Sequence, residues 1–283
     1  MKHTSEELRD IAYRHRKRFL ELFTRLGFGH VTSAFSWAEI ATVLCYEIMD
    51  LPSKNVPSKY RLSKSSAEKF YDRMVISKGH GCGIIFPILE DVGLVSKAEI
   101  EASLQVGGDK SKVNKYFYPG FDFYGGSLGI GLGMAVGLAK GAKLGNEVWK
   151  TYCVVGDAEC YEGSMWEAIH FATHHRLDNL VVIVDRNGLG VSDFTESMLR
   201  LEPFAEKWTA SGWNVREIDG HDVRALFESM TEAKNACDEK PQCIIAHTKK
   251  GKGLSYLVDN PLMHGYIPTN GADIERAFRE LEH

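Results

Sequence analysis

Two side chains that carry oxygen ligands follow two β-rich runs of the sequence. Asp157 follows the apolar run Thr151–Val155 after one glycine, Gly156, and Asn187 follows the β-branched run Leu180–Val184. Between them, Glu162–His174 has apolar residues at helical spacing. This pattern predicts a βαβ unit, which places both loops at the carboxyl ends of parallel strands. Open α/β sheets bind their ligands at that edge.

A carboxylate, an amide oxygen and a backbone carbonyl at this edge would form a site for a hard cation. Such oxygen ligands suit Mg²⁺ or Ca²⁺ and do not suit zinc. The backbone amides that follow Gly156, including that of Ala158, precede a predicted helix start and would add an anion site. Together these features predict a cradle for a magnesium-bound diphosphate. The alternative is a nucleotide-binding type of unit in which Asp157 only caps a helix and Asn187 only forms a turn.

Two histidines lie in turns where an imidazole could move protons near neutral pH. His30 lies in a glycine-bounded turn, and the alternative for it is an ordinary loop histidine. Lys78 and His80 follow the candidate strand Arg73–Ile76, where a cation and an imidazole suit a diphosphate or phosphorylated ligand. The alternative for that pair is a solvated lysine beside a capping histidine.

Three further groups have weaker patterns. Gly126-Ser127-Leu128 would let the backbone approach a planar ligand, although close helix packing explains the glycines equally well. Lys250 lies in the run KKGKG, which alone indicates a solvated charge, and His264 follows after a glycine-containing stretch. Glu162 could simply complement the positive N-terminus of the helix that it precedes.

Composition narrows the class of protein. The chain has 283 residues, 44% hydrophobic and 25% charged, with a net charge of −4, so it resembles ordinary globular proteins and gives no reason to expect nucleic acid or an anionic membrane as partner. The six cysteines form no CxxC pair or zinc spacing, which favours reduced core thiols in a cytoplasmic protein. The N-terminus lacks the apolar core of a signal peptide, and no segment reaches the ~20 apolar residues that span a bilayer.

Strand and helix patterns alternate along the chain, so we predict an α/β fold with a doubly wound, mostly parallel sheet flanked by helices, in one domain over residues 1–283. Ser36 with Glu39 has the pattern of a capping box, and Thr4 or Ser5 could cap the first helix. Residues 106–124, rich in glycine, lysine and aromatics, are predicted to form a long loop. Beyond the βαβ unit, further strands are predicted near 213–218 and 242–247, and helices near 5–25, 36–49, 126–144, 204–211, 223–236 and 273–281.

Several motifs resemble one enzyme family over nearly the whole chain. The Asp157 and Asn187 segments together resemble the thiamine diphosphate signature in its transketolase form. The similarity extends only to that family's first, diphosphate-binding domain. The motifs are GDAECYEGSMWEA, LDNLVVIVDRNGLGVSD, GHVTS followed by SWAEI, DRMVISKGHGCGIIFPIL, GGSLGIGL, and IIAHTKKGKG followed by MHG.

The resemblance implies roles for individual residues. It implies that His30 faces the reacting carbons and that His80 and His264 lie by the cofactor and substrate as further catalytic groups. It implies a metal ion, Mg²⁺ with Ca²⁺ as the alternative, held by Asp157, Asn187 and the Leu189 carbonyl. Glu162 matches the family's acid that links two active sites of a dimer. Contacts to thiamine diphosphate are implied for Ser33, Lys78, His80, Gly126, Ser127, Leu128, Gly156, Ala158, Glu162, Asn187, Lys250 and His264.

This sequence departs from the family in two places. Val31 replaces a proline, which removes no functional group. The family's further histidine, in a GHP turn that holds the donor's hydroxyls, has no counterpart, because no histidine occurs between His80 and His170 and the corresponding region reads Gly107-Gly108-Asp109-Lys110. The cofactor site therefore matches the family, whereas the donor pocket does not, and the sugar or sugar-phosphate substrate stays open.

We expect the chain to be the N-terminal subunit of a split transketolase that transfers a two-carbon unit from a ketose to an aldehyde. A C-terminal subunit would supply the pyrimidine-binding domain and its activating glutamate, in an α₂β₂ heterotetramer. One alternative is a subunit of a 2-oxo acid decarboxylase or dehydrogenase, which GHVTS, SKGH and KGKG together disfavour. The other is a non-catalytic partner subunit, which the presence of His30, His80, Asp157 and Asn187 disfavours.

Overall fold

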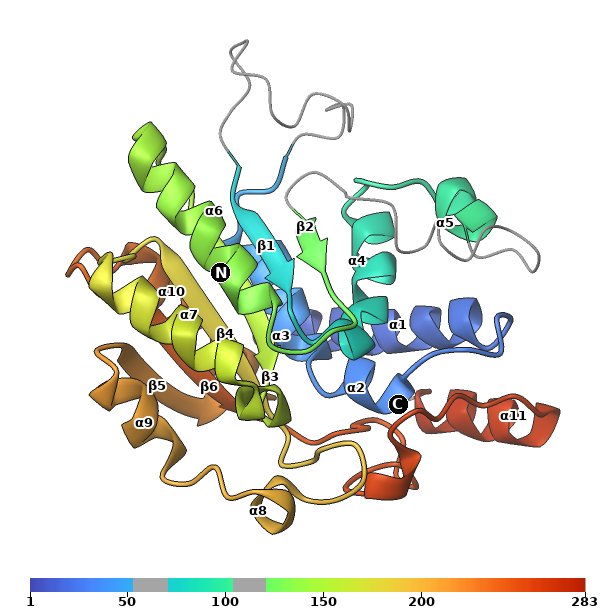
Figure 1. Cartoon of the computed structure of the whole chain (residues 1–283). Helices are drawn as coiled ribbons and strands as arrows, with labels where there is room; N and C mark the ends of the chain where they lie inside the picture. Colours follow the sequence, from blue (N-terminus) through green and yellow to red (C-terminus); the bar gives the residue numbers. More distant parts are fainter. Residues whose placement is uncertain (53–70, 104–120, 283) are drawn as a thin grey trace.

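The computed structural model describes residues 1–52, 71–103 and 121–282, and in this part of the chain six parallel strands form one sheet (Figure 1). The strand order is β2-β1-β3-β4-β6-β5. Helices cover both faces, so the predicted doubly wound α/β fold is confirmed. The strands are β1 (Arg73–Ile76), β2 (Phe121–Tyr124), β3 (Thr151–Gly156), β4 (Leu180–Arg186), β5 (Asn214–Asp219) and β6 (Gln242–His247).

The chain reverses its direction of travel across the sheet between β1 and β3. β1 and β3 are hydrogen-bonded neighbours, with Ile76 opposite Val154, yet β1 is followed in sequence by β2 on one side and β3 by β4 on the other. The loops after these two strands therefore diverge and leave a crevice at the carboxyl edge. Lys78 follows β1 and Asp157 follows β3, so both lie at the kind of switch point where such sheets bind ligands.

The central strands are buried on both faces because their side chains alternate between two hydrophobic clusters. In β4, Val181 and Ile183 point into one cluster, and Val182 and Val184 into the other. The first cluster contains residues of α1 (Ser5–Phe23), α2 (Val31–Phe35), α3 (Ala38–Val43), α4 (Ile85–Asp91), α10 (Val223–Asn235) and α11 (Gly271–Glu280). The second contains residues of α6 (Gly131–Gly145), α7 (Gly163–His174) and α9 (Phe204–Ala210).

Shorter elements complete the described part of the chain. A π-helical turn extends α3, and 3₁₀ turns follow β1 and β3 at the carboxyl edge. These elements are Leu44–Ile48 (π), Gly79–Ile84, Ala158–Tyr161 and Pro261–Met263 (3₁₀), α5 (Lys97–Ser103) and α8 (Thr195–Met198).

Helix α1 is fixed at its start by a cap and at its middle by a buried ion pair. Thr4 caps the helix, as predicted, and forms a capping box with Glu7. Arg16, fully buried, donates to Glu39 of α3 at 2.8 and 2.6 Å and to the Phe35 carbonyl at 2.8 Å. Because both charges are out of water, the pairing fixes α1 against α3.

Two local predictions were wrong. Residues 121–124, predicted as loop, form the edge strand β2, which pairs with β1; the run FDFY is too short to stand out from the glycine- and lysine-rich stretch before it. Ser36 does not cap a helix, because its hydroxyl donates instead to the Ser33 carbonyl at 3.0 Å and to Asp185 at 2.5 Å. The remaining residues of the predicted 106–124 loop, up to 120, lie outside the described residues.

Two predictions from composition concern membrane-spanning segments and the burial of cysteines. Within the described ranges, no helix is long and apolar enough to cross a bilayer. Cys45, Cys153, Cys160 and Cys243 are buried, as expected of core thiols, whereas Cys237 is exposed.

A buried histidine predicts a pH dependence of stability. Burial lowers the pKa of His15 from 6.5 to about 4. As the pH falls below 6.5 the unfolded chain takes up this proton before the folded chain does, so stability declines down to about pH 4, by roughly 3 kcal/mol. His15→Gln should make the plot of unfolding free energy against pH shallower in this window, as measured by urea unfolding. His170→Gln, on an exposed residue of α7, is the matched control and should leave the slope unchanged; equal slopes in all three proteins would contradict the prediction.

Candidate active site

A cavity at the carboxyl edge collects most of the predicted site residues. It lies where the loops after β1, β3, β4 and β6 meet, next to the turn that leads into α6. The predicted residues that line it are Ser33, Lys78, His80, Leu128, Gly156, Asp157, Ala158, Asn187, Leu189, Lys250 and His264, joined by Glu159, Gly190 and Val191, which the sequence analysis did not single out.

Asp157 is the buried carboxylate at the centre of this cavity. Its Oδ1 accepts a hydrogen bond from the Ala158 amide at 2.7 Å, and its Oδ2 accepts from the Gly188 amide at 2.6 Å and from Arg186 at 3.2 Å. Burial raises the pKa of Asp157 by more than the Arg186 guanidinium lowers it. The carboxylate therefore gains from any further positive charge brought beside it.

The other two predicted metal ligands lie on the loop that Asp157 holds. The Asn187 amide oxygen accepts from the Leu189 amide at 3.1 Å. The Leu189 and Gly190 carbonyls accept from the Lys250 ammonium at 3.4 and 2.9 Å. A carboxylate, an amide and carbonyls that already receive a cation form a hard-oxygen set that fits Mg²⁺ or Ca²⁺.

Asp185, which the sequence analysis missed, joins four segments of the carboxyl edge. Its carboxylate accepts from Lys78, from Ser36 at 2.5 Å, from Asn187 at 3.1 Å and from Thr248. Burial acts to raise its pKa, but Lys78 and these hydrogen bonds hold the pKa below the usual range. The sequence feature that could have indicated Asp185 is its position as an acidic residue at the end of a β-branched strand.

Glu159, also missed, fixes three loops at once. Its carboxylate accepts from Ser77 after β1, from the Gly129 amide at 2.8 Å ahead of α6, and from the Gly156 amide at 3.0 Å. Lys78 was expected near a ligand. Its ammonium instead donates to Asp185, to the Ser33 carbonyl and to Ser36, so its charge is largely neutralised within the protein.

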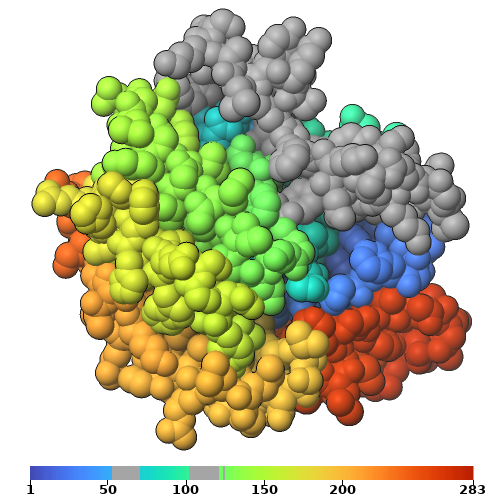
Figure 2. Space-filling model, in the orientation of Figure 1, coloured from blue at the N-terminus to red at the C-terminus, as the bar shows by residue number. Residues whose placement is uncertain are grey.

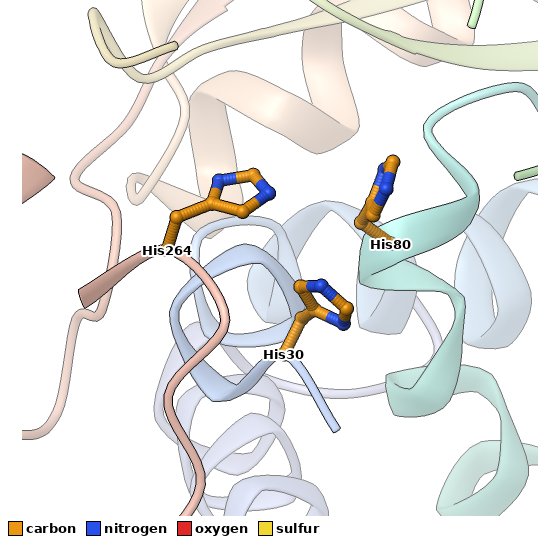
Figure 3. A group of neighbouring side chains, drawn as sticks. All are labelled: His30, His80 and His264. Atoms are coloured by element: carbon orange, nitrogen blue, oxygen red, sulfur yellow. The ribbon is translucent and has the colours of Figure 1, made fainter. Parts of the chain in front are cut away.

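Three histidines from distant parts of the sequence face one another beside the cavity (Figure 3). The ring centroids of His30 and His80 lie 5.0 Å apart, those of His30 and His264 5.4 Å, and those of His80 and His264 5.5 Å. Their nearest nitrogens lie within 4.8 Å of one another. All three are partly buried; His80 and His264 line the cavity, and His30 lies next to both of them.

The chain's last segment completes this cluster by docking on its first turn. Thr32 donates to the His264 carbonyl at 3.1 Å, and its own carbonyl accepts from the Gly251 amide at 3.0 Å. The Val31 amide donates to the Tyr266 carbonyl at 3.2 Å. Figure 2 shows this C-terminal segment, in red, lying against the N-terminal residues, in blue.

The electrostatic surroundings keep the three imidazoles neutral. Burial, followed by the nearby Lys250 charge, lowers the pKa of His264 from 6.5 to about 4. Burial also lowers the pKa of His30 and His80, with smaller effects of neighbouring positive groups. Lys250, 3.0 Å from His264 Nδ1, has its pKa lowered to about 8, chiefly by burial. The cluster can thus accept or relay protons at neutral pH.

The remaining predicted residues lie outside this cavity. Gly126 lines a neighbouring cavity, together with His30. Ser127 lies in the turn between β2 and α6, and Glu162 is the N-cap residue of α7, against Gly129. The altered donor region Gly107–Lys110 lies outside the described residues.

Comparisons with known proteins agree with this geometry. A family model described as the thiamine diphosphate-binding domain of transketolase matches residues 14–280. One of the subunits of the apulose-4-phosphate transketolase of Phocaeicola vulgatus is 34% identical over 268 residues, covering 95% of this chain and 91% of that protein. Transketolase of Homo sapiens is 35% identical over 283 residues, covering 98% of this chain and 43% of that protein.

Solved structures show the same fold. Transketolase from Leishmania mexicana superimposes with a TM-score of 0.80 at 25% identity, covering 99% of this chain and 41% of that chain. The chain therefore spans most of the length of the apulose-4-phosphate transketolase subunit but less than half the length of these other transketolases.

The arrangement of Lys250 and His264 predicts a change in proton affinity. Lys250→Met removes the positive charge beside His264, so the pKa of His264 should rise from about 4 toward 6.5. Following the histidine ring signals by NMR through a pH titration measures this shift. Lys249→Met, on the exposed neighbouring lysine, is the control and should leave the His264 titration in place. The same shift in both variants, or in neither, would contradict the assigned cause.

Proposed function

Because the chain belongs to the transketolase family, through its thiamine diphosphate-binding domain, we propose that it is the N-terminal subunit of a split transketolase. With a partner subunit it transfers a two-carbon ketol unit from a ketose donor to an aldehyde acceptor. The observation that carries this proposal is that one cavity is lined by the Asp157–Asn187–Leu189 oxygen set and by two neutral imidazoles, His80 and His264, with the His30 imidazole beside them. A cation and diphosphate site beside proton-transfer groups is what this chemistry requires of the protein.

The cofactor proposed is thiamine diphosphate with Mg²⁺. Asp157, the Asn187 amide oxygen and the Leu189 carbonyl would hold the ion, and the amides around Gly156 and Ala158 would meet the diphosphate. Lys250 already rests on the Leu189 and Gly190 carbonyls, within reach of the same cavity. When bound, thiamine diphosphate supplies the electron sink for breaking and forming the carbon–carbon bonds.

The chain's own residues would orient the substrate and move its protons. His30, His80 and His264 are neutral and partly buried, so one of them can accept a hydroxyl proton from the donor as its carbon–carbon bond breaks. The same group can return a proton to the new hydroxyl once the acceptor has been joined. Ser33 and Leu128 line the same cavity as the metal loop and would position the cofactor.

A second chain is proposed to complete the active site. It would supply the pyrimidine-binding domain with its activating glutamate, in an α₂β₂ heterotetramer with Glu162 near the contact between two sites. The match to two apulose-4-phosphate transketolase subunits, over 91% and 88% of their lengths, supports a separately encoded partner. Four buried thiols suit a reducing compartment, which supports a cytoplasmic location.

The activity is tested on the purified complex of this chain with its co-expressed partner. With thiamine diphosphate and Mg²⁺, we expect a ketose donor and an aldehyde acceptor to give a ketose two carbons longer than the acceptor, detected by mass spectrometry. Omitting the cofactor should abolish the product. If no ketose in a broad panel gives such a product while a 2-oxo acid is decarboxylated, the proposed function is wrong.

The metal assignment is tested by Asp157→Asn. This variant keeps the size of the side chain and an acceptor oxygen for one of the two amides, that of Ala158 or that of Gly188, but removes the charge that faces the ion. Because even an indirect ligand partner is typically worth 10- to 100-fold in metal affinity, we expect Mg²⁺-dependent cofactor binding by the complex to weaken by about 100-fold or more, measured by calorimetry. Asp10→Asn, an exposed carboxylate of α1, is the control. Unchanged magnesium dependence in Asp157→Asn would refute the assignment.

A further inference from the structure

A second cavity, of about 400 Å³, adjoins the histidine cluster. It is formed by α1, the turn before α2, the 3₁₀ turn after β1, α4 and the turn after β2. Four of the seven side chains that the described residues contribute to its lining are phenylalanines, and we call it the aromatic chamber. The residues that define it are Phe19, Phe23, Phe28, Gly29, His30, Gly79, His80, Cys82, Gly83, Phe86, Gly125 and Gly126.

The phenylalanine rings form a continuous apolar wall. The rings of Phe19 and Phe23 stack with centroids 4.3 Å apart, and Phe23 lies 6.1 Å from Phe86. Gly83 lets this wall approach closely, because a Cβ there would lie 2.5 Å from Phe19 and 2.9 Å from Phe23. The wall is therefore fixed by packing and does not depend on a mobile side chain.

The chamber offers little to a charged or highly hydroxylated group. Among the described residues that line it there is no lysine, arginine, aspartate or glutamate. The polar side-chain atoms that the described lining residues contribute are those of His30, His80 and Cys82. Burial lowers the pKa of both histidines and raises the pKa of the Cys82 thiol to about 12, so all three are neutral near pH 7.

The chamber adjoins the candidate active site. His80 lines both cavities, and the His30 ring, in the chamber, lies 5.4 Å from the His264 ring, in the other. A substrate whose reacting carbon lies among the three imidazoles can therefore extend its remainder along the phenylalanine wall.

Phe28 marks the entrance to this chamber. It is 63% exposed, although its ring lies edge-on to His30 with centroids 6.3 Å apart. A large apolar ring left in water beside a catalytic imidazole gains free energy when an apolar ligand covers it.

We propose that the aromatic chamber binds an apolar chain or ring of the aldehyde acceptor. This inference rests on the proposed ketol transfer and names the class of acceptor for it. In that reaction a donor R–CHOH–CO–CH₂OH loses R–CHO as its C2–C3 bond breaks, and an acceptor R′–CHO gains the two carbons to give R′–CHOH–CO–CH₂OH. The chamber selects R′ groups that are aliphatic or aromatic over polyhydroxylated ones.

The test is a series of acceptors with the purified complex and one ketose donor. Each methylene transferred from water to such a wall is expected to raise kcat/KM about three- to fourfold, from propanal up to the length that fills the chamber. Unbranched aldehydes should exceed aldoses of the same carbon number. A flat series, or a preference for the aldose at every length, overturns the inference.

A pair of matched variants tests whether the gain in kcat/KM per methylene arises in the aromatic chamber. Phe28→Ser should reduce the gain in kcat/KM per methylene. Each kcat/KM is expressed relative to that for glycolaldehyde on the same variant, because glycolaldehyde has no chain to place in the chamber. Phe171→Ser, on a phenylalanine of α7 that is 45% exposed, is the control and should keep the full gain. Equal gains in wild type and Phe28→Ser overturn the inference.

A binding measurement separates failure of this inference from failure of the proposed function. Saturation-transfer NMR compares benzyl alcohol with glycerol on the complex and on its Phe28→Ser variant. Preferential binding of benzyl alcohol that Phe28→Ser weakens supports the chamber, even if no acceptor is turned over and ketol transfer is thereby refuted. Benzyl alcohol that binds this chain alone but not the complex would show that a partner side chain fills the chamber, and would overturn the inference.

Discussion

The carboxyl edge of this sheet depends on one buried carboxylate, that of Asp185. It is fully removed from water and accepts from Lys78, Ser36, Asn187 and Thr248. A buried charge without partners would be strongly destabilising, so folding requires all four groups to converge. The loops after β1, β4 and β6 and the start of α3 are thereby brought to one point. Glu159 does the same for the turn into α6 and the end of β3.

This arrangement separates structural charges from those that face the cavity. Lys78 is neutralised by Asp185, whereas Lys250 contacts carbonyls and an imidazole and has its pKa lowered to about 8. Asp157 is paired with Arg186, which itself is shared with Glu196 and Glu202 at 2.9 Å each. The groups paired with Arg186 therefore carry net negative charge beside the metal loop, which suits a divalent cation, whereas Lys250 is a cationic side chain next to the neutral His264.

Elements with a clear local pattern of apolar residues could be predicted from the sequence. Elements and contacts that depend on pairing between distant segments could not. The β-branched and apolar runs predicted β1, β3, β4 and β6 nearly to the residue, because buried parallel strands leave a clear apolar signature. β2 was missed because its four residues give only a short strand signal next to a glycine- and lysine-rich stretch, and its pairing with β1 was needed to identify it. The strand–helix–strand pattern singled out Asp157 and Asn187, and the family resemblance predicted roles for them and for the histidines, whereas Asp185 and Glu159 became visible only through their partners. Ser36 was misassigned because its hydroxyl had a better acceptor in Asp185, which is 149 positions away in sequence.

The docking of residues 250–266 on the turn at His30 has a consequence for biosynthesis. Sheet strands β1, β3 and β4 and their helices can pair once residue 186 has been synthesised, but Thr32 cannot reach the His264 carbonyl, 232 positions later, until residue 264 has been synthesised. Contacts between residues so far apart in sequence cost more loop-closure entropy than local contacts do. A nascent chain on the ribosome can therefore form the scaffold of β1, β3 and β4 before it can bring His30, His80 and His264 together.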